Sequence, residues 1–338
     1  MRNTSTRLTG AALEALLGAA AMLLSVAVQF ATPAAAQAQD YPTRAIRLIV
    51  PQAPGGGTDI LGRNVAQKLA ELLKQPVIVE NKAGAGSLIG TDFVAKAPAD
   101  GYTLLVGGIF NMVMNKALIK NLPYEPARDF VPIGYVSAYP FVLLARSDMP
   151  VENLADLVKY AKDRPGKLSY GSAGIGTLQH VWGAILLKSL GLDMLHVPFK
   201  GAAPAHQEMM AGRLDILFDN LSASKQYVQS AKLKGLVVSS ANRSAQLPNV
   251  PTINETGLVK FEGESWFGLF APSATPAPVV EKLRDALAAI NRDAEFAARI
   301  ERDGGRMLAI PPPQQQRFMQ DEIDRWVKLV EQYAVTTD

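Results

Sequence analysis

A short strand-like run, a glycine-rich turn and a helical pattern follow one another three times in this sequence. The runs cover residues 45–50, 77–80 and 168–170, and the turns cover residues 51–59, 81–87 and 171–177. Strands that alternate with helices in this way usually pair in parallel. The pattern therefore predicts an α/β fold in which strands lead directly into helices.

The alternation of strands and helices continues toward the C-terminus. Further strands are predicted at residues 103–106, 135–145, 193–197, 215–218, 234–239 and 266–271, and amphipathic helices at residues 277–291 and 312–333. The strand at 266–271 returns the chain after a second set of strand–helix units, so we expect two lobes. The first lobe is predicted to contain residues 40–142 and 266–338, and the second residues 143–265.

The segment 1–36 has the pattern of a secretory signal peptide. Arg2 and Arg7 form a basic region before a long apolar stretch, residues 8–30, and small residues before Gln37 and Gln39 offer cleavage sites. We therefore expect export to the periplasm. An uncleaved membrane anchor is the alternative, because about 20 apolar residues can span a bilayer. The chain has no cysteine, which excludes disulfides, thiolate catalysis and attachment of a lipid to cysteine.

Charge and motif content exclude several classes of partner and cofactor. The formal net charge is +3, with acidic and basic residues interspersed, so no nucleic-acid partner is expected. None of the glycine-rich turns fits the dinucleotide fingerprint, and residues 57–64 lack the lysine of a P-loop. The spacing of the three histidines suggests no metal site. We expect no cofactor and, since heptads are absent, a monomer.

The glycine-rich turns suit an anion. Backbone N–H groups at a helix N-terminus lack partners, and the helix dipole there favours negative charge. A single turn of this kind can be an ordinary strand–helix connection. Three such turns in one chain favour anion binding over a purely structural role. The candidate N–H donors or caps are Gly55, Gly57, Thr58, Gly174, Gly176 and Thr177.

Four side chains extend the list of candidates. Ser172 and His180 lie at the third turn and could donate hydrogen bonds to an anion, while Lys200 and Asp219 follow predicted strands, where open α/β sheets bind ligands. Ser172, His180 and Asp219 could also imitate a catalytic triad, so a secreted hydrolase is the alternative function. Hydrolase motifs such as G-x-S-x-G are absent from the turns, and we expect a binding protein, not an enzyme.

Motifs spread over nearly the whole mature chain resemble one known family. They include PGGGTD at 54–59, VENKAGAG at 79–86, APADGYTLL at 97–105, GSAGIGTLQH at 171–180, HVPFKG at 196–201 and LPNVPT at 247–252. The sequence is similar to the solute-binding receptors of tripartite tricarboxylate transporters, the TctC or Bug-type proteins.

The resemblance implies a fold and a mode of binding. The implied fold is that of type II periplasmic binding proteins, in which two strands cross between the lobes and a ligand is clamped between them. A ligand carboxylate would be held by backbone amides and waters from the turns 51–59 and 171–177. Membrane permease subunits would be the partners, with a signalling protein as the alternative.

The sequence departs from the family pattern at positions that flank the expected cleft. Gln52 and Ala53 replace an aromatic residue and a proline, residues 108–111 replace a threonine-rich stretch, and Phe199 replaces a tyrosine. The apolar Ile109 and Phe110 make an aromatic or aliphatic acid at least as suitable a ligand as citrate. The cleft candidates added by the resemblance are Gln52, Pro54, Asp59, Phe110 and Asn111.

Overall fold

The computed structural model describes residues 41–336. The segment 1–36, interpreted as a signal peptide, lies outside the described residues. Within the described part of the chain, no helix combines the length and the apolar character needed to cross a membrane.

The first lobe is organised around three parallel strands in the order β2, β1, β3. The central strand, β1, is almost entirely buried, as expected for a parallel strand covered on both faces by helices. The elements of this part are β1 (Ile46–Val50), α3 (Gly57–Leu73), β2 (Val77–Asn81), α4 (Leu88–Ala95), β3 (Thr103–Gly108), the π-helix η1 (Phe110–Met114), α5 (Asn115–Leu118) and α6 (Pro126–Asp129).

The second lobe repeats the strand–turn–helix arrangement. Its strand β5 pairs in parallel with both β6 and β7, so the parallel pairing predicted from the sequence is confirmed here as well. The elements are α7 (Leu154–Lys162), β5 (Ser169–Ser172), α8 (Leu178–Ser189), β6 (Leu195–Pro198), α9 (Ala202–Met210), β7 (Ile216–Asn220), α10 (Leu221–Gln229), β8 (Leu233–Val238) and the short 3₁₀ helix η2 (Asn254–Thr256).

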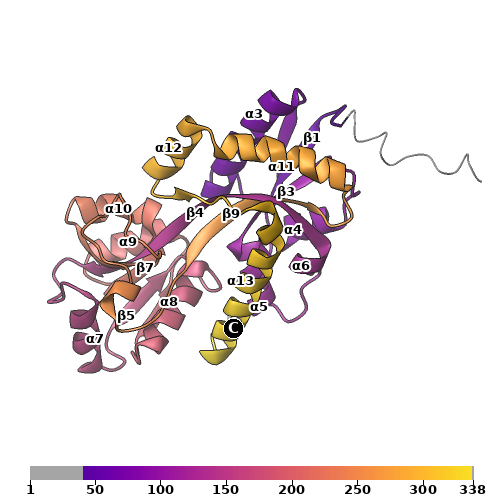
Figure 1. The fold of residues 1–338 in the computed structure, drawn as a ribbon. Coiled ribbons are helices and arrows are strands. Elements are labelled where there is room, and N and C mark those ends of the chain that lie inside the picture. Colours follow the sequence, from indigo (N-terminus) through magenta and orange to yellow (C-terminus); the bar gives the residue numbers. More distant parts are fainter. Residues whose placement is uncertain (1–40, 337–338) are drawn as a thin grey trace, which may run out of the picture. The chain divides into compact units, whose positions relative to one another are not determined.

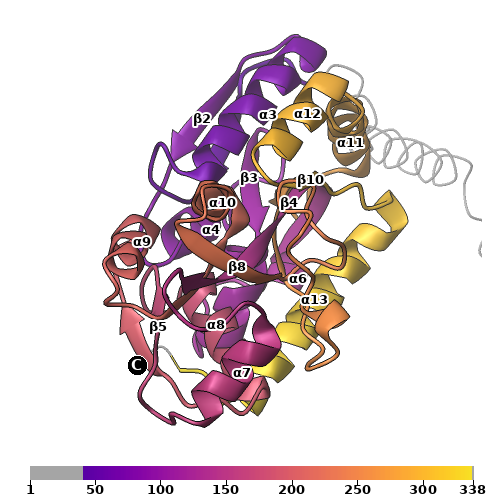
Figure 2. The ribbon, with the colours of Figure 1, turned by 90° about the vertical axis from the view of Figure 1, so that its left-hand side faces the viewer.

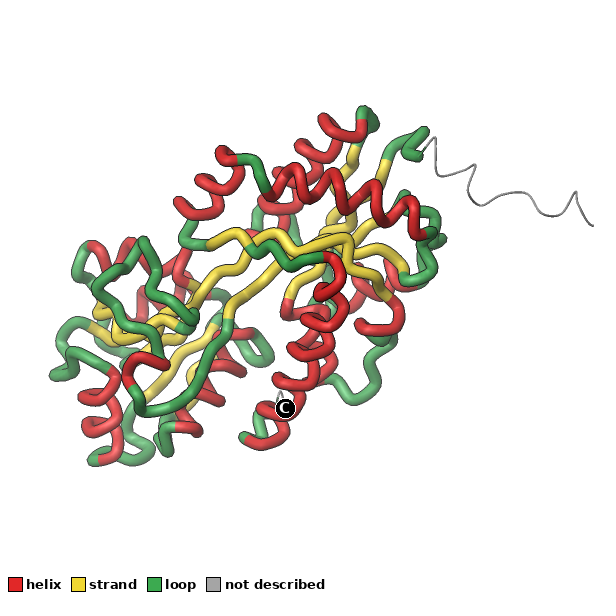
Figure 3. Tube along the Cα trace, in the orientation of Figure 1, coloured by secondary structure: helices red, strands yellow, loops and turns green. Residues whose placement is uncertain are grey.

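Two antiparallel strands, β4 (Phe130–Arg146) and β9 (Glu264–Pro272), run between the lobes (Figures 1 and 3). The first part of β4 pairs with β9, and its last part pairs with β7 and β8 of the second lobe. The lobe boundary expected after residue 142 falls inside β4, and the one expected before residue 266 falls inside β9. The two sheets are therefore joined by one continuous strand.

The β4–β9 pair is closely packed where Gly268 pairs with Tyr135, the residue after Gly134. A Cβ added to Gly268 would lie 2.6 Å from the carbonyl oxygen of Gly134, which is closer than real Cβ atoms approach a backbone oxygen. Only a residue without a side chain fits at position 268. The local sequence thus allows the two crossing strands to pack closely.

The C-terminal residues return to the first lobe as α11 (Ala277–Asn291), α12 (Ala294–Arg302), β10 (Arg306–Met307) and α13 (Pro312–Gln332). In Figures 1 and 2, α11 and α12 lie beside α3 at one end of the sheet, and α11 packs on β4. In Figure 1, α13 lies on the other side of the β4–β9 ribbon, where it packs on η1 and α5 and also reaches α8 of the second lobe.

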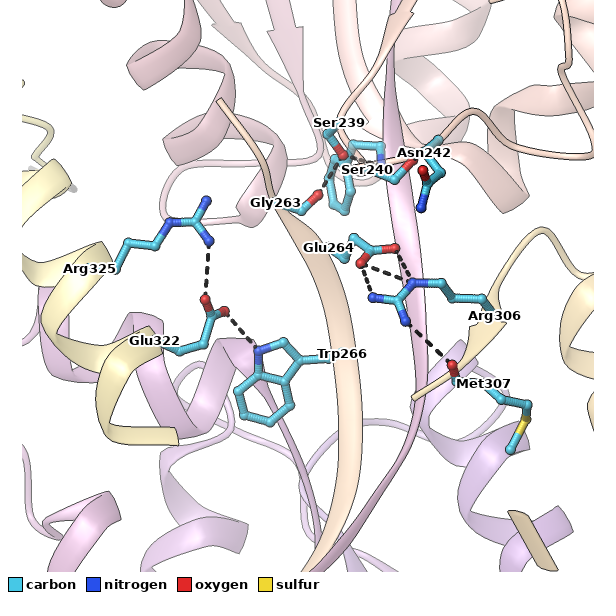
Figure 4. A network of polar contacts seen from close by, with 11 residues as sticks. Ser239, Ser240, Asn242, Gly263, Glu264, Trp266, Arg306, Met307, Glu322 and Arg325 are labelled. Carbon is cyan, nitrogen blue, oxygen red and sulfur yellow. Dashed lines mark hydrogen bonds and ion pairs between the residues drawn. The ribbon is translucent and has the colours of Figure 1, made fainter. Parts of the chain in front are cut away.

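Polar contacts fix the beginning of β9 to both lobes (Figure 4). Arg306 donates from Nε to Glu264 Oε1 at 3.0 Å, and Trp266 donates from Nε1 to Glu322 Oε2 on α13 at 3.1 Å. Immediately before the strand, the carbonyl oxygen of Gly263 accepts a hydrogen bond from Ser239 Oγ at 2.5 Å, next to the end of β8. The crossing strand is therefore anchored at the point where it leaves the second lobe.

Two stacked indole rings join α8 to α13. The ring centroids of Trp182 and Trp326 lie 4.9 Å apart with an angle of 16° between the planes, and both side chains are fully buried. Phe261 contacts Trp326 edge-on at 6.0 Å. This aromatic cluster is where the C-terminal helix is held against the second lobe.

Replacing Trp326 with alanine is expected to lower the free energy of unfolding by about 3 to 5 kcal/mol, because a large buried side chain leaves a cavity. Urea denaturation followed by circular dichroism measures the change. Arg317→Ala on the same helix is the control, since that side chain is 84% exposed and such changes usually stay within about 0.5 kcal/mol. A loss below about 1 kcal/mol for Trp326→Ala would contradict the importance assigned to the stack.

Candidate functional site

A cavity of about 560 Å³ lies where both lobes and both crossing strands meet. The first lobe contributes Pro51, Gln52, Ala53, Gly57, Thr58, Ala83, Gly84, Gly86, Ser87, Gly108, Phe110 and Asn111. The second lobe contributes Thr177, Leu178, Gln179 and Asn220, and the crossing strands contribute Phe141, Ser265 and Phe267. Of the sequence-derived candidates, the lining includes Gln52, Gly57, Thr58, Phe110, Asn111 and Thr177.

The turn after β1 is held in shape by Asp59. Its buried carboxylate accepts hydrogen bonds from the backbone N–H of Gly55 at 2.9 Å, from Arg63 Nε at 3.0 Å and from Asn81 Nδ2 at 2.8 Å. The hydrogen bond from Arg63, followed by those from Gly55 and Asn81, lowers the pKa of Asp59 to about 2 against the opposing effect of burial. Asp59 lies outside the cavity lining, so its part in the site is to fix the turn.

Two other polar contacts shape the wall that this turn presents. Thr58 donates from Oγ1 to Gln52 Oε1 at 2.7 Å, and Asn81 donates from Nδ2 to the carbonyl oxygen of Gln52 at 3.1 Å. Pro54 and Gly55 are exposed and lie outside the lining. The turn therefore contributes Pro51, Gln52, Ala53, Gly57 and Thr58 to the cavity lining.

The second glycine-rich turn, after β2, has an unusual backbone. Gly84, Ala85, Gly86 and Ser87 all have positive φ, at 132°, 46°, 62° and 70°. For the non-glycine residues Ala85 and Ser87 this conformation costs on the order of 1–2 kcal/mol each. Such strain concentrates at functional sites, and here it lies directly in the cavity wall. The sequence marked this turn as glycine-rich, but none of its residues was among the candidates.

The two lobes differ in whether the helix N-termini at the cavity are capped by a side chain. In the first lobe, α3 and α4 have no side chain bonded to the N-terminal N–H groups. In the second lobe, Thr177 caps α8 by accepting from the N–H of His180, and Asn220 caps α10 by accepting from the N–H of Ser222. At the cavity, the helices without a side-chain cap, an arrangement that favours an anion, therefore belong to the first lobe, while each cap in the second lobe satisfies one N–H group.

Asn111 lines the cavity, and both polar atoms of its side chain are hydrogen-bonded. It accepts from the N–H of Gly108 at 2.9 Å and donates to Thr91 Oγ1 at 2.9 Å, and its carbonyl oxygen accepts from Tyr124 at 2.6 Å. These contacts hold η1 against the end of β3. They position Phe110, the residue before Asn111, at the cavity.

In the second lobe, His180 lies behind the turn. His180 Nδ1 accepts a hydrogen bond from the N–H of Gly176 at 3.2 Å, and its ring stacks on His196 at 4.2 Å. His196 Nε2 lies 2.8 Å from Ser172 Oγ. Ser172, Gly174, Gly176 and His180 all lie outside the lining, so these residues support the turn that carries Thr177.

The three candidates for a catalytic triad are not joined to one another. Ser172 is fully buried and pairs with His196, whereas His180 pairs with Gly176. Asp219 accepts from Gln179 Nε2 at 3.0 Å and lies 3.2 Å from His206 Nε2. Asp219 thus orients Gln179, which does line the cavity.

Lys200 lies on the surface. Its side chain is exposed and lies outside the cavity lining. Among residues 41–336, no group of three or more histidine, aspartate or glutamate side chains is arranged to hold a metal ion.

Several lining residues were missed by the sequence analysis, namely Gln179, Asn220, Phe141, Ser265 and Phe267. Gln179 and Asn220 adjoin residues that were selected, and their positions at the start of α8 and the end of β7 were available as signals. Phe141, Ser265 and Phe267 lie on the crossing strands, where only the pairing of β4 with β9 and β7 brings them to the cavity.

The stacked histidines make the stability of the fold depend on pH. Burial, reinforced by the neighbouring His180 ring, lowers the pKa of His196 to about 4. Below about pH 6.5 the unfolded chain takes up a proton at this residue that the folded protein does not accept. The free energy of unfolding is therefore expected to fall as the pH drops from about 6.5 toward 4.

A His196→Gln variant keeps a hydrogen-bonding group near Ser172 but cannot titrate. Its free energy of unfolding should fall less than that of the wild type between pH 6.5 and pH 4, as measured by urea denaturation at several pH values. The comparison uses only the change in the free energy of unfolding with pH. A loss of stability that is the same at every pH therefore does not affect it. Equal slopes in the two proteins would show that His196 protonates as readily when folded as when unfolded.

Comparison with known proteins finds the same family over most of the chain. The model of the tripartite tricarboxylate transporter family receptor matches residues 61–335. The chain is 35% identical over 316 residues to the UPF0065 protein in the tcbD–tcbE intergenic region of Pseudomonas sp. strain P51, covering 93% of this chain and 94% of that protein.

Solved structures of similar proteins have the same fold. The periplasmic binding protein BugD is 36% identical, with a TM-score of 0.74, covering 88% of this chain and 100% of BugD. Rpa4515 of R. palustris, solved with adipate, is 33% identical with a TM-score of 0.77, covering 88% of this chain and 99% of that one.

Proposed function

Because this chain belongs to the tripartite tricarboxylate transporter receptor family, we propose that it captures a small organic carboxylate between its two lobes and delivers it to a membrane permease. The type II periplasmic-binding-protein fold expected from the sequence is confirmed by the match to BugD. The family consists of solute-binding receptors, and the function proposed for this chain is binding without chemical conversion.

The cavity shared by the lobes carries this proposal. Its first-lobe wall contains the starts of α3 and α4, neither of which has a side-chain cap. A carboxylate has only acceptor oxygens and a negative charge, so it complements N–H groups at the positive end of a helix. Adipate, the acid named with Rpa4515, supports a carboxylate as the class of ligand.

The second lobe completes the site. Three of its residues line the same cavity: Thr177 is the N-cap of α8, Gln179 lies in the first turn of α8, and Asn220 ends β7. A ligand docked on the first lobe would gain these contacts only when the lobes approach each other, so binding favours the closed arrangement. The permease subunits would then recognise the closed form.

Two further parts of the proposal concern the protein's location in the cell and its oligomeric state. We assign it to the periplasm, because segment 1–36 has the pattern of a signal peptide and BugD is a periplasmic protein. We propose a monomer, since both walls of the cavity come from one chain. The chain matches a family of transporter receptors, so the expected partner is the membrane permease of such a transporter.

A thermal-shift screen of the mature protein against mono-, di- and tricarboxylates tests this function. A ligand at 100 times its dissociation constant stabilises a protein by about 2.7 kcal/mol, which raises the melting temperature measurably. The bound acid should be recovered chemically unchanged after incubation. If no carboxylate stabilises the folded protein, the proposed function is wrong.

Gly57→Trp should abolish carboxylate binding and leave a folded protein. An added Cβ at Gly57 meets no atom within 4 Å, and φ at this position is not positive, so the indole can extend into the cavity without straining the backbone. Calorimetric titration with the acid found in the screen measures binding, and the melting temperature without ligand reports folding.

Ala277→Trp is the matched control for this variant. Ala277 is also the first residue of a helix, α11, and is exposed, but it lies outside the cavity lining. Its affinity should equal that of the wild type. Wild-type affinity in Gly57→Trp as well would place the ligand elsewhere.

A further inference from the structure

The lining of the cavity carries no charged side chain among the described residues. Its polar groups are amides and hydroxyls, such as those of Gln52, Thr58 and Gln179. The negative charge of a ligand must therefore be balanced by the backbone, and each helix N-terminus supplies only about half a unit of positive charge. The uncapped starts of α3 and α4 together match one carboxylate.

The second-lobe wall is unfavourable for another carboxylate. The helices that begin there, α8 and α10, are already capped by Thr177 and Asn220. Directly behind this wall, the buried Asp219 carboxylate accepts from Gln179 Nε2 at 3.0 Å. His206 lies against Asp219 at 3.2 Å on its other side, away from the lining, and is charged only if protonated. A second ligand charge at this wall would meet no cationic side chain.

Three phenyl rings, of Phe110, Phe141 and Phe267, occupy the remaining wall. Phe110 starts η1, while Phe141 and Phe267 lie on the crossing strands β4 and β9. The rings of Phe110 and Phe267 are only partly buried. Partly exposed rings in a cavity are typical of a site that receives an apolar ligand face.

The surroundings fix these rings in place. Phe267 packs edge-on against Tyr139 at 6.1 Å and covers Gly108, where a Cβ would come within 3.0 Å of the ring. Phe141 packs edge-on against Trp182 at 4.8 Å. Phe110 lies over Gly86, at 3.6 Å from where a Cβ would be. Rings that are already held in place lose little conformational entropy when a ligand binds, and this favours affinity.

The volume of the cavity permits a ligand with a ring. About 560 Å³ falls within the range of roughly 300–1,000 Å³ that is usual for pockets holding drug-sized molecules. We propose that the preferred ligand is an aromatic acid with a single carboxylate. The carboxylate lies at the starts of α3 and α4, and the ring lies against Phe110 and Phe267.

This inference rests on the proposed function, and a series of acids separates the two. Calorimetric titration of the mature protein uses benzoate, malate, adipate and citrate as probes at one pH and ionic strength. Benzoate is expected to bind at least tenfold more tightly than each of the others. If adipate, malate or citrate binds as tightly as benzoate or more tightly, the inference is overturned and the carboxylate function stands; if none of the acids binds, both fail.

A ring-deletion variant tests the named contact. Phe110→Leu retains an apolar side chain but loses the ring, and should weaken benzoate binding about fivefold, within the range of aromatic pair energies. Phe93→Leu is the matched control, because Phe93 on α4 faces Arg47 and Lys82 outside the lining; its benzoate affinity should be unchanged. Unchanged affinity in Phe110→Leu would overturn the placement of the ring. If that variant does not fold, the acid series with the wild-type protein decides alone.

Discussion

The structure depends on one strand that belongs to two sheets. β4 is hydrogen-bonded to β9 along its first part and to β7 and β8 along its last part. The lobes therefore cannot move independently without bending or breaking backbone hydrogen bonds. The change of partner occurs near Phe141, whose N–H donates to Ser239 Oγ at 2.8 Å. Since Phe141 also lines the cavity, the floor of the site and the joint between the lobes are the same piece of chain.

The two lobes contribute different chemistry to the cavity. The first lobe offers uncapped helix starts and a strained turn at 84–87, while in the second lobe the side chains of Thr177 and Asn220 each accept from one N–H group in the first turn of α8 and α10. Buried carboxylates support the lining without entering the cavity: Asp59 fixes the turn after β1 through Gly55, and Asp219 accepts from the lining residue Gln179. This asymmetry favours capture of an anion by the first lobe, followed by contacts from the second.

The fold was largely predictable because its signals are local. The helical pattern expected after the turn 171–177 is α8 (Leu178–Ser189), and Thr177, a candidate cap from the sequence, is its N-cap. The parallel pairing of β1 with β2 and β3, and of β5 with β6 and β7, was predictable from the alternation of strands and helices along the sequence. The site was predictable where a turn leads directly into a helix, as at Gly57, Thr58 and Thr177.

The rest of the site depends on strand register, which no local pattern specifies. Phe141 faces Asn220 because β4 pairs with β7 in that register, and Phe267 faces Gly108 through the pairing of β9 with β3. In the same way, the pairing of β5 with β6 brings His196 beside Ser172. The sequence instead suggested His180 for that position because it lies at the same glycine-rich turn as Ser172. Contacts between distant segments therefore decided which candidates reach the cavity.

The Trp182–Trp326 stack also gives the molecule an internal optical reporter. The chain contains three tryptophans, and two of them form this contact between α8 and α13. Coupling between stacked indoles changes steeply with their separation and orientation. A shift of the second lobe relative to the C-terminal helix would therefore alter the ultraviolet circular dichroism and the emission of the protein without an added dye.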